Sequence, residues 1–130
     1  GAKVALIFEI EGETGFRERE TRLIDELTQR PRIVLATGGG AVLAADNRRC
    51  LAERGLVVYL KSPVEKLVER VRYDTNRPLL RTADPEGTLR AIVAQREPLY
   101  QEVADLTIDT GRLSVKQAIK RITSNLPWTP

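Results

Sequence analysis

Histidine is absent from this chain of 130 residues, and Cys50 is its single cysteine. Without histidine there is no imidazole general base, which excludes Ser-His-Asp and Cys-His nucleophile systems and most zinc sites. One cysteine cannot form an internal disulfide, so we expect a reducing, cytoplasmic compartment. Methionine is absent too, even at position 1. Because the chain begins at Gly1 without it, we expect a chain shortened by processing or truncation.

The sequence also lacks a strong excess of one charge and any long apolar run. Lysine and arginine number 21 against 18 aspartates and glutamates, and the two signs are interspersed. This balance allows an anionic small ligand and gives no reason to expect nucleic acid. No apolar stretch approaches the ~18 residues of a membrane span, and no signal peptide is visible. With 42% hydrophobic and 30% charged residues, we expect one soluble globular domain over residues 1–130.

Short apolar runs and helical periodicities alternate along the chain. The runs at 33–36, 56–60 and 105–109 have the length and composition of buried parallel strands. Apolar residues at helical spacing predict helices at 1–10, 16–30, 45–54, 62–71, 89–97 (ending before Pro98) and 114–126, with a long polar loop at 74–86. Such alternation predicts a parallel sheet covered by helices on both faces. Three strands are few for such a sheet, so we expect part of the domain to lie outside this chain.

Helix ends carry their own signals. Ser62, followed by proline and then Glu65, predicts an N-cap serine with a capping box, and Ser114 with Gln117 repeats that pattern. Gly55 stands where a left-handed residue commonly ends a helix. These signals fix the expected boundaries of three helices.

Three consecutive glycines, Gly38, Gly39 and Gly40, follow the apolar run 33–36 directly. Glycine lets backbone N–H groups approach a ligand closely and form a concavity that accepts anions. In open α/β sheets, ligands bind just beyond the carboxyl ends of strands. A flexible connection to the next helix is the alternative. We favour the ligand-binding role, because a simple loop rarely needs three glycines in a row.

Three arginines have neighbours that single them out. Arg17 stands one helical turn before Glu20, and at this spacing the carboxylate of Glu20 can orient the guanidinium group of Arg17. Arg96 comes late in a predicted helix, and Arg77 lies in the polar loop. Guanidinium groups suit planar carboxylates and phosphates. Each arginine alone is more often a surface residue in an ion pair of little consequence.

Five motifs stand in order along the chain: Glu11-Gly12-Glu13 with Gly15-Phe16-Arg17 and Glu20, Ala36-Thr37-Gly38-Gly39-Gly40-Ala41-Val42, Val58-Tyr59-Leu60, Arg77-Pro78-Leu79-Leu80 and Arg96-Glu97-Pro98-Leu99-Tyr100. Together they resemble the shikimate kinases across essentially all 130 residues. The resemblance implies a P-loop NTPase-type α/β fold, similar to nucleoside monophosphate kinases. It also implies transfer of the γ-phosphoryl group of ATP to the 3-hydroxyl of shikimate, with Mg²⁺, in the pathway to chorismate and the aromatic amino acids. We expect shikimate as the small-molecule partner, no nucleic-acid or membrane partner, and a monomer.

The resemblance also implies roles at the substrate site. Arg17 and Arg96 bind the carboxylate of shikimate, and Glu20 supports the site. The backbone of Gly38–Gly40 binds the edge of the substrate that carries the hydroxyl groups. These residues are the expected substrate site.

At the nucleotide, the resemblance implies four further residues. Arg77, in a lid over residues 72–84, reaches the transferring phosphate and is the expected catalytic residue. Arg70 packs on the adenine. Arg112 and Leu113 form a turn that closes over the base. No metal ligand is assigned in this chain.

One departure from the family is large. The family's P-loop, Gly-x-x-x-x-Gly-Lys-Ser/Thr, and its two-aspartate motif have no counterpart in the chain. Gly1 aligns well inside the family's domain, so we expect roughly 40 residues or more to be lacking, since they exceed a βαβ unit of about 30. Three readings remain: part of a shikimate kinase, a non-catalytic carboxylate-binding remnant, or another small-molecule P-loop kinase.

Overall fold

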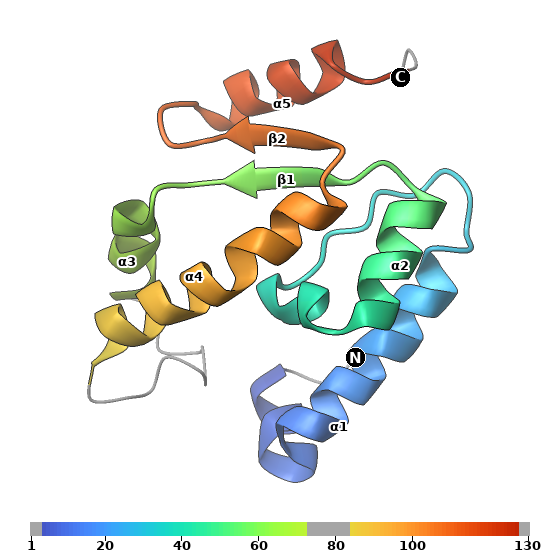
Figure 1. Cartoon of the computed structure of the whole chain (residues 1–130), viewed down its shortest axis with the longest axis vertical. Coiled ribbons are helices and arrows are strands. Elements are labelled where there is room, and N and C mark those ends of the chain that lie inside the picture. Colours follow the sequence, from blue (N-terminus) through green and yellow to red (C-terminus); the bar gives the residue numbers. More distant parts are fainter. Residues whose placement is uncertain (1–3, 73–83, 128–130) are drawn as a thin grey trace.

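The fold is known from a computed structural model, in which the structure describes residues 4–72 and 84–127. Its elements follow one another along the chain as α1 (Val4–Leu27), the short 3-10 helix η1 (Gly39–Leu43), α2 (Ala45–Arg54), β1 (Val58–Lys61), α3 (Val64–Arg72), α4 (Pro85–Val103), β2 (Leu106–Asp109) and α5 (Val115–Ser124). Figure 1 shows α1, η1 and α2 grouped on one side of the strands, with α4 crossing toward them. The α/β alternation predicted from the sequence is confirmed.

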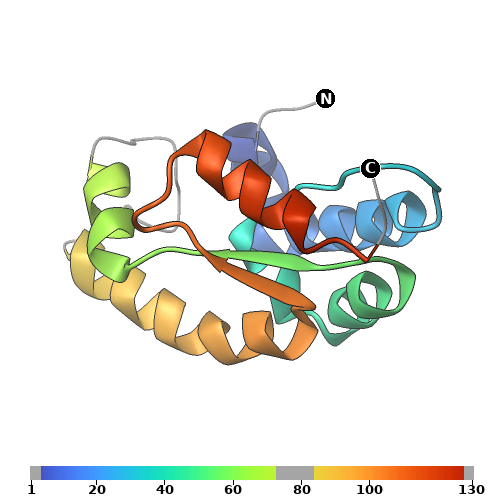
Figure 2. The same cartoon turned by 90° about the horizontal axis from the view of Figure 1, so that it is seen from above.

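The two strands lie parallel and in register, with Val58 opposite Leu106 and Lys61 opposite Asp109. A parallel pair needs a crossover connection, and α3 and α4 lie on that connection. Seen from above in Figure 2, α4 and α5 lie on opposite sides of the strands. The sheet is therefore covered on both faces, as predicted.

The strand predicted at 33–36 is wrong for this structure. Residues 33–38 are extended but form no ladder with β1 or β2, and Val34 is fully exposed. A β-strand needs a neighbour to satisfy its backbone groups, and the described residues supply none beside this run. Figure 1 shows it as an extended connection from α1 to η1.

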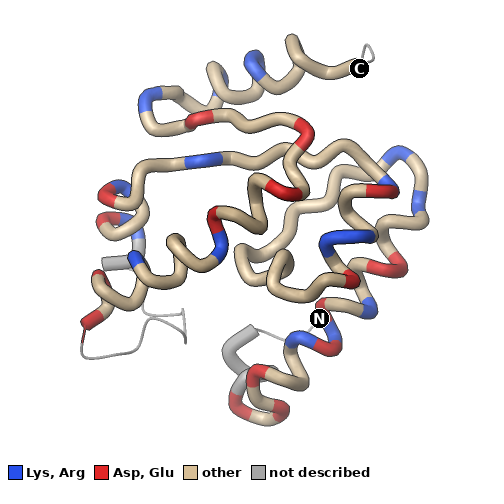
Figure 3. Tube along the Cα trace, viewed as in Figure 1, with Lys and Arg blue, Asp and Glu red and all other residues tan. Residues whose placement is uncertain are grey.

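Helix α1 contains one break, at Gly12, where φ is 72° and ψ is −176°. The sequence predicts separate helices at 1–10 and 16–30, and the structure confirms a break between them, although only Gly12 leaves the helical conformation. Positive φ is strained for other residues and open to glycine. Figure 3 shows acidic and basic positions alternating along α1 beyond this point, which is typical of a solvated helix face.

One predicted helix start is confirmed and one is wrong, while α2 ends at Arg54 before Gly55 as predicted but without the left-handed conformation. Ser114 and Gln117 form the complete capping box at the start of α5. The Ser62 hydroxyl, by contrast, is buried without a hydrogen-bond partner in the described part of the chain, and α3 begins at Val64. Gly55 is extended, with φ −170° and ψ 177°, because the chain leaves α2 directly toward β1 and needs no reversal.

Helix α4 runs through Pro98 instead of ending before it. Proline inside a helix costs ~3 kcal/mol or more, because it removes a backbone hydrogen bond and crowds the preceding turn. The contacts on either side of Pro98 offset this cost. The carboxylate of Glu97 accepts a hydrogen bond from Tyr59 of β1, the Tyr100 hydroxyl donates to Gly39, and Val103 is buried.

The described core lies beneath η1, where Ile24 of α1, Ala41 of η1 and Cys50 of α2 form a buried cluster. Leu51 packs against this cluster from α2. The core therefore joins α1 to the segment that carries the three glycines. Among the described helices, none combines the length and the apolar character needed to cross a membrane.

Candidate functional site

The three glycines form a tight turn that enters η1. Gly38 is extended, with φ −69° and ψ 159°, and its carbonyl oxygen accepts a hydrogen bond of 3.2 Å from the N–H of Ala41. Gly40 and Ala41 are buried, whereas Gly38 and Gly39 are exposed. One side of the turn therefore rests on the core and the other is open.

Arg17 lies directly against this turn. A β-carbon placed on Gly40 would fall 2.6 Å from Cζ of Arg17, so only glycine leaves room for the guanidinium group. Nη1 of Arg17 donates to Oε1 of Glu20 at 2.9 Å, which confirms the contact predicted from their spacing. The Cζ atom also lies 5.1 Å from the centre of the Phe16 ring. Sequence-local contacts thus hold Arg17 in place over Gly40.

Glu20 joins Arg17 to the first glycine of the turn. Its side chain is 12% exposed, and its Oε2 atom lies 3.8 Å from where a β-carbon on Gly38 would stand. The carboxylate therefore contacts both the guanidinium group and the turn. Such a charged hydrogen bond fixes the orientation of the arginine.

Arg96 and Tyr100 approach the turn from α4. A β-carbon on Gly39 would stand 3.5 Å from Nη1 of Arg96 and 3.0 Å from the hydroxyl of Tyr100. The Tyr100 hydroxyl donates to the carbonyl oxygen of Gly39 at 2.6 Å. The structure therefore brings α1 and α4 together at one glycine turn, each with an arginine.

Two buried donor atoms on these arginines have no hydrogen-bond partner among the described residues. They are Nε of Arg17 and Nε of Arg96. Buried polar atoms are nearly always paired in folded proteins, so these two atoms favour an anionic ligand between the helices. Two guanidinium groups beside backbone N–H groups are suited to a carboxylate with neighbouring hydroxyl groups.

Tyr59 and Glu97 support α4 and were not predicted as functional. The Tyr59 hydroxyl donates to Oε2 of Glu97, and Lys61 lies 3.3 Å from the same carboxylate. The hydrogen bond from Tyr59 holds the pKa of Glu97 below its usual value. Burial raises the pKa of Tyr59, and the Glu97 carboxylate adds to that shift. The one sequence signal for Glu97 was its place beside Arg96 in the motif Arg96-Glu97-Pro98-Leu99-Tyr100.

The residues expected at the nucleotide lie at another part of the molecule. The turn at Gly111 packs on the start of α3, and the Lys66 ammonium group donates to the carbonyl oxygen of Gly111. Arg70, one helical turn after Lys66, and Arg112 are both exposed, and Leu113 closes the turn through its N–H to Thr110 at 3.2 Å. Exposed guanidinium planes can stack on a purine, so the exposure of Arg70 and Arg112 is compatible with binding of a nucleotide base. Lys66 carried no sequence signal.

Arg77 lies outside the described residues, as does most of the lid expected at 72–84. Within the described ranges, no three or more aspartate, glutamate or cysteine side chains form a group able to hold a metal ion. The described residues therefore assign no ligand to Mg²⁺.

Comparison with known proteins identifies the family of the chain. The family model for shikimate kinase matches residues 1–127. The shikimate kinase of Bordetella pertussis is 57% identical over 126 residues, which is 97% of this chain and 60% of the relative. That of Burkholderia lata is 54% identical over 97% of this chain and 68% of the relative. This chain thus spans less than two thirds of the length of the Bordetella relative.

Solved structures give the same answer for the fold. A shikimate kinase from Acinetobacter baumannii in complex with shikimate superposes with a TM-score of 0.88 at 50% identity, covering 95% of this chain and 70% of the other. A shikimate kinase from Bacteroides thetaiotaomicron gives 0.80 at 25% identity, covering 94% and 73%. These likenesses confirm the P-loop NTPase-type α/β fold. Together with the family model, they show that this chain belongs to the shikimate kinase family.

Proposed function

We propose that this chain carries the shikimate-binding part of an ATP-dependent shikimate kinase. The reaction transfers the γ-phosphoryl group of ATP to the 3-hydroxyl of shikimate, giving shikimate 3-phosphate for chorismate and aromatic amino acid biosynthesis. The family membership of the chain supports this proposal, as does the relative that was solved in complex with shikimate.

The observation that carries the proposal is the approach of Arg17 and Arg96 to one glycine turn. Arg17 lies over Gly40 and Arg96 beside Gly39, and each has a buried Nε with no hydrogen-bond partner among the described residues, Nε of Arg17 lying 3.8 Å from Oε1 of Glu13. In the proposal, the two guanidinium groups bind the substrate carboxylate. The backbone of Gly38–Gly40 binds the hydroxyl groups, and Glu20 holds Arg17 in place.

The proposed nucleotide-side roles follow from the chemistry of phosphoryl transfer. The 3-hydroxyl oxygen of shikimate attacks the γ-phosphorus and ADP leaves, so the enzyme must position both substrates and neutralise charge. Arg77 meets the charge on the transferring group, while Arg70 and the Arg112–Leu113 turn hold the base. Bound ATP and Mg²⁺ supply the phosphoryl group and part of the charge neutralisation. The described residues form no metal site, so no step here depends on a metal ligand of this chain.

A second reading rests on the absence of a Gly-x-x-x-x-Gly-Lys-Ser/Thr run from the 130 residues. Taken alone, such a chain would bind a shikimate-like acid and not phosphorylate it. Intact mass spectrometry of the purified protein separates the readings. A mass well above 14.6 kDa favours the kinase, and a match to that mass favours the binding module.

The proposal includes a monomer in a reducing, cytoplasmic compartment. The sole cysteine, Cys50, is buried and free, as is usual where thiols stay reduced. Light scattering on the purified protein should give the mass of one chain.

The test of the proposed activity is ADP formation by the complete protein with ATP, Mg²⁺ and shikimate. We expect ADP release only when shikimate is present. The methyl ester of shikimate is the matched control, because it keeps the hydroxyl groups and removes the carboxylate charge. Release of ADP without shikimate, or equally well with the ester, would contradict the proposal.

A further inference from the structure

The carbonyl oxygens of η1 are bound by side chains from neighbouring helices. In α2, Nδ2 of Asn47 donates to the carbonyl oxygen of Ala41 at 3.0 Å. Nη1 of Arg48 donates to the carbonyl oxygens of Val42 at 2.7 Å and Leu43 at 3.2 Å. Two consecutive residues of α2 thus bind three consecutive carbonyl groups.

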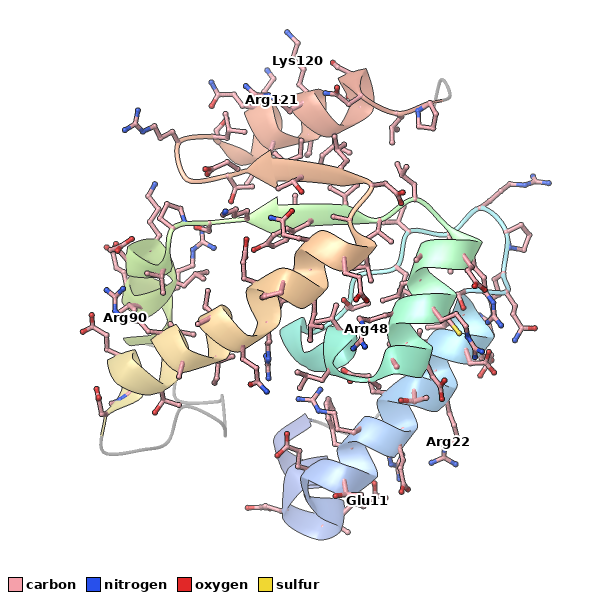
Figure 4. All side chains as sticks on the ribbon, viewed as in Figure 1. Glu11, Arg22, Arg48, Arg90, Lys120 and Arg121 are labelled. Carbon is pink, nitrogen blue, oxygen red and sulfur yellow. The ribbon has the colours of Figure 1, made fainter. Side chains whose placement is uncertain are left out.

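Arg48 also joins the turn to α4. Its Nε atom lies 2.8 Å from Oε2 of Glu102, near the end of α4. Figure 4 shows Arg48 reaching from α2 into the region between η1 and α4. Because α4 carries Arg96, this one side chain joins the last residues of η1 to the helix that holds the second arginine.

Asn47 is in a costly position unless it supports the turn. Its side chain is 2% exposed and sits close to the apolar cluster that contains Ala41. Its Oδ1 atom has no hydrogen-bond partner in the described part of the chain. A buried amide destabilises the fold when only part of it is hydrogen-bonded. The contribution of this amide to the structure is therefore its bond to η1.

Tyr100 binds the turn from the other side. Its hydroxyl donates to the carbonyl oxygen of Gly39, and its ring lies 4.9 Å from that of Tyr59, centre to centre. Arg96 and Tyr100 are four residues apart on α4, which places them on one face of the helix. The same helix therefore presents a guanidinium group and a hydroxyl group to Gly39.

We propose that Asn47, Arg48 and Tyr100 are positioning residues for shikimate recognition, because they bind carbonyl oxygens of η1, from Gly39 to Leu43, and so fix the open side of the glycine turn against Arg17 and Arg96. This inference rests on the proposed function. The three residues do not touch the substrate in this account. They raise the fraction of molecules in which the turn is ready to bind it.

The size of the expected effect follows from that fraction. The apparent Kd of a ligand rises in proportion as the competent state becomes less populated. Removing one hydrogen bond that holds the turn should therefore raise the Kd for shikimate by about three- to tenfold. Nucleotide binding, at another part of the molecule, should not change.

Tyr100→Phe is the main test, in the complete protein, with calorimetric titration of shikimate and of ADP. The variant keeps the ring contact with Tyr59 and removes the hydroxyl that donates to Gly39 and interacts with Arg96. Thr123→Val is the matched control, because it removes a hydroxyl that donates to a backbone carbonyl oxygen, that of Ile119 in α5, without touching the turn or α4. We expect Tyr100→Phe to raise the Kd for shikimate about three- to tenfold and to leave the Kd for ADP unchanged. In Thr123→Val the Kd for shikimate should stay within about twofold.

Arg48→Lys is a second test that does not depend on the tyrosine. Lysine keeps the charge but cannot bind two carbonyl groups and Glu102 together. Arg49→Lys is its control, since the side chain of Arg49 is 62% exposed and makes a long ion pair of 3.8 Å with Asp46. We expect a raised KM for shikimate in Arg48→Lys with kcat nearly retained at saturation, and no change in Arg49→Lys.

The outcomes separate this inference from the proposed function. Wild-type protein that binds no shikimate would overturn the proposed function and the inference with it. If the wild type binds shikimate, unchanged affinity in Tyr100→Phe and Arg48→Lys would overturn the inference alone. An equal loss in Tyr100→Phe and Thr123→Val would also overturn it, because that result means general loosening of the fold.

Discussion

Replacement of Gly40 by alanine tests whether the glycine exists to make room for Arg17. Gly40 is not among the residues with positive φ, so alanine can adopt its backbone conformation without strain. Its β-carbon would stand 2.6 Å from Cζ of Arg17, closer than real contacts allow. Because the guanidinium group is the far end of a flexible side chain, the protein can relieve the clash by moving it. That movement breaks the 2.9 Å bond to Glu20.

The expected cost to stability is small. The Arg17–Glu20 pair is partly exposed, and such pairs contribute about 0.2–1 kcal/mol. Alanine in place of glycine stabilises the folded state by about 0.4–1 kcal/mol, because it lowers the conformational entropy of the unfolded chain. The two effects nearly cancel, so the free energy of unfolding should change by less than about 1 kcal/mol.

The expected cost to binding is much larger. Loss of a charged hydrogen-bond partner of the substrate carboxylate costs about 1.5–3 kcal/mol, which is roughly a 10- to 150-fold rise in the Kd for shikimate. Calorimetric titration and urea unfolding of the complete protein measure the two quantities. Gly55→Ala is the matched control, because Gly55 is extended and a β-carbon there meets nothing within 4 Å. Shikimate affinity in Gly40→Ala within twofold of the wild type would refute the reasoning.

Three further changes test other parts of the site in the complete protein. Arg17→Lys and Arg96→Lys should each weaken shikimate binding by about 1.5–3 kcal/mol, since an ammonium group cannot reproduce the planar fork; unchanged affinity in calorimetry for both would remove the carboxylate assignment. Arg77→Ala should lower kcat on the order of a hundredfold with little change in shikimate Kd, because its charge contact belongs to the reacting state; near-normal turnover would exclude it from catalysis. The hydrogen bond from Tyr59 lowers the folded-state pKa of Glu97 from its usual 4.5, so the stability from this carboxylate is present above that value and is lost as pH falls through the lower pKa. Urea unfolding should therefore show the difference between wild type and Glu97→Gln shrinking from pH 6 to pH 3, and a constant difference would contradict this role.

The two predicted capping boxes show when a local signal at a helix start is enough. The capping box at Ser114 and Gln117 forms within four residues, and it is present in full. At Ser62 the same pattern fails. Pro63 lies against the turn at Gly111, where a β-carbon would stand 2.8 Å from the proline ring. That distant contact, together with the end of β1, decides how the chain enters α3.

Pro98 shows the same limit in a helix interior. A proline predicts the end of a helix, because its ring removes a backbone hydrogen bond and destabilises the helix locally. The continuation to Val103 depends on contacts that Glu97 makes with β1 and Tyr100 makes with η1. Neither partner lies near α4 in the sequence, so the spacing of α4 alone could not reveal them.

The candidate substrate site was predictable in part. The contact between Arg17 and Glu20 follows from helical spacing, and three glycines in a row indicate a close approach of some group. That the group is Arg17 follows only from packing, since α1 meets η1 through the buried core. Asn47 gave no signal, because a polar residue on an amphipathic helix is ordinarily assigned to the solvent face.

The most direct test of this account is a crystal structure of the complete protein with shikimate bound. We expect the carboxylate between Arg17 and Arg96, with guanidinium nitrogens at about 2.7–3.2 Å from its oxygens. The ring hydroxyl groups should face the backbone of Gly38–Gly40. Density for shikimate elsewhere on the protein, or with its carboxylate turned away from both arginines, would contradict the account.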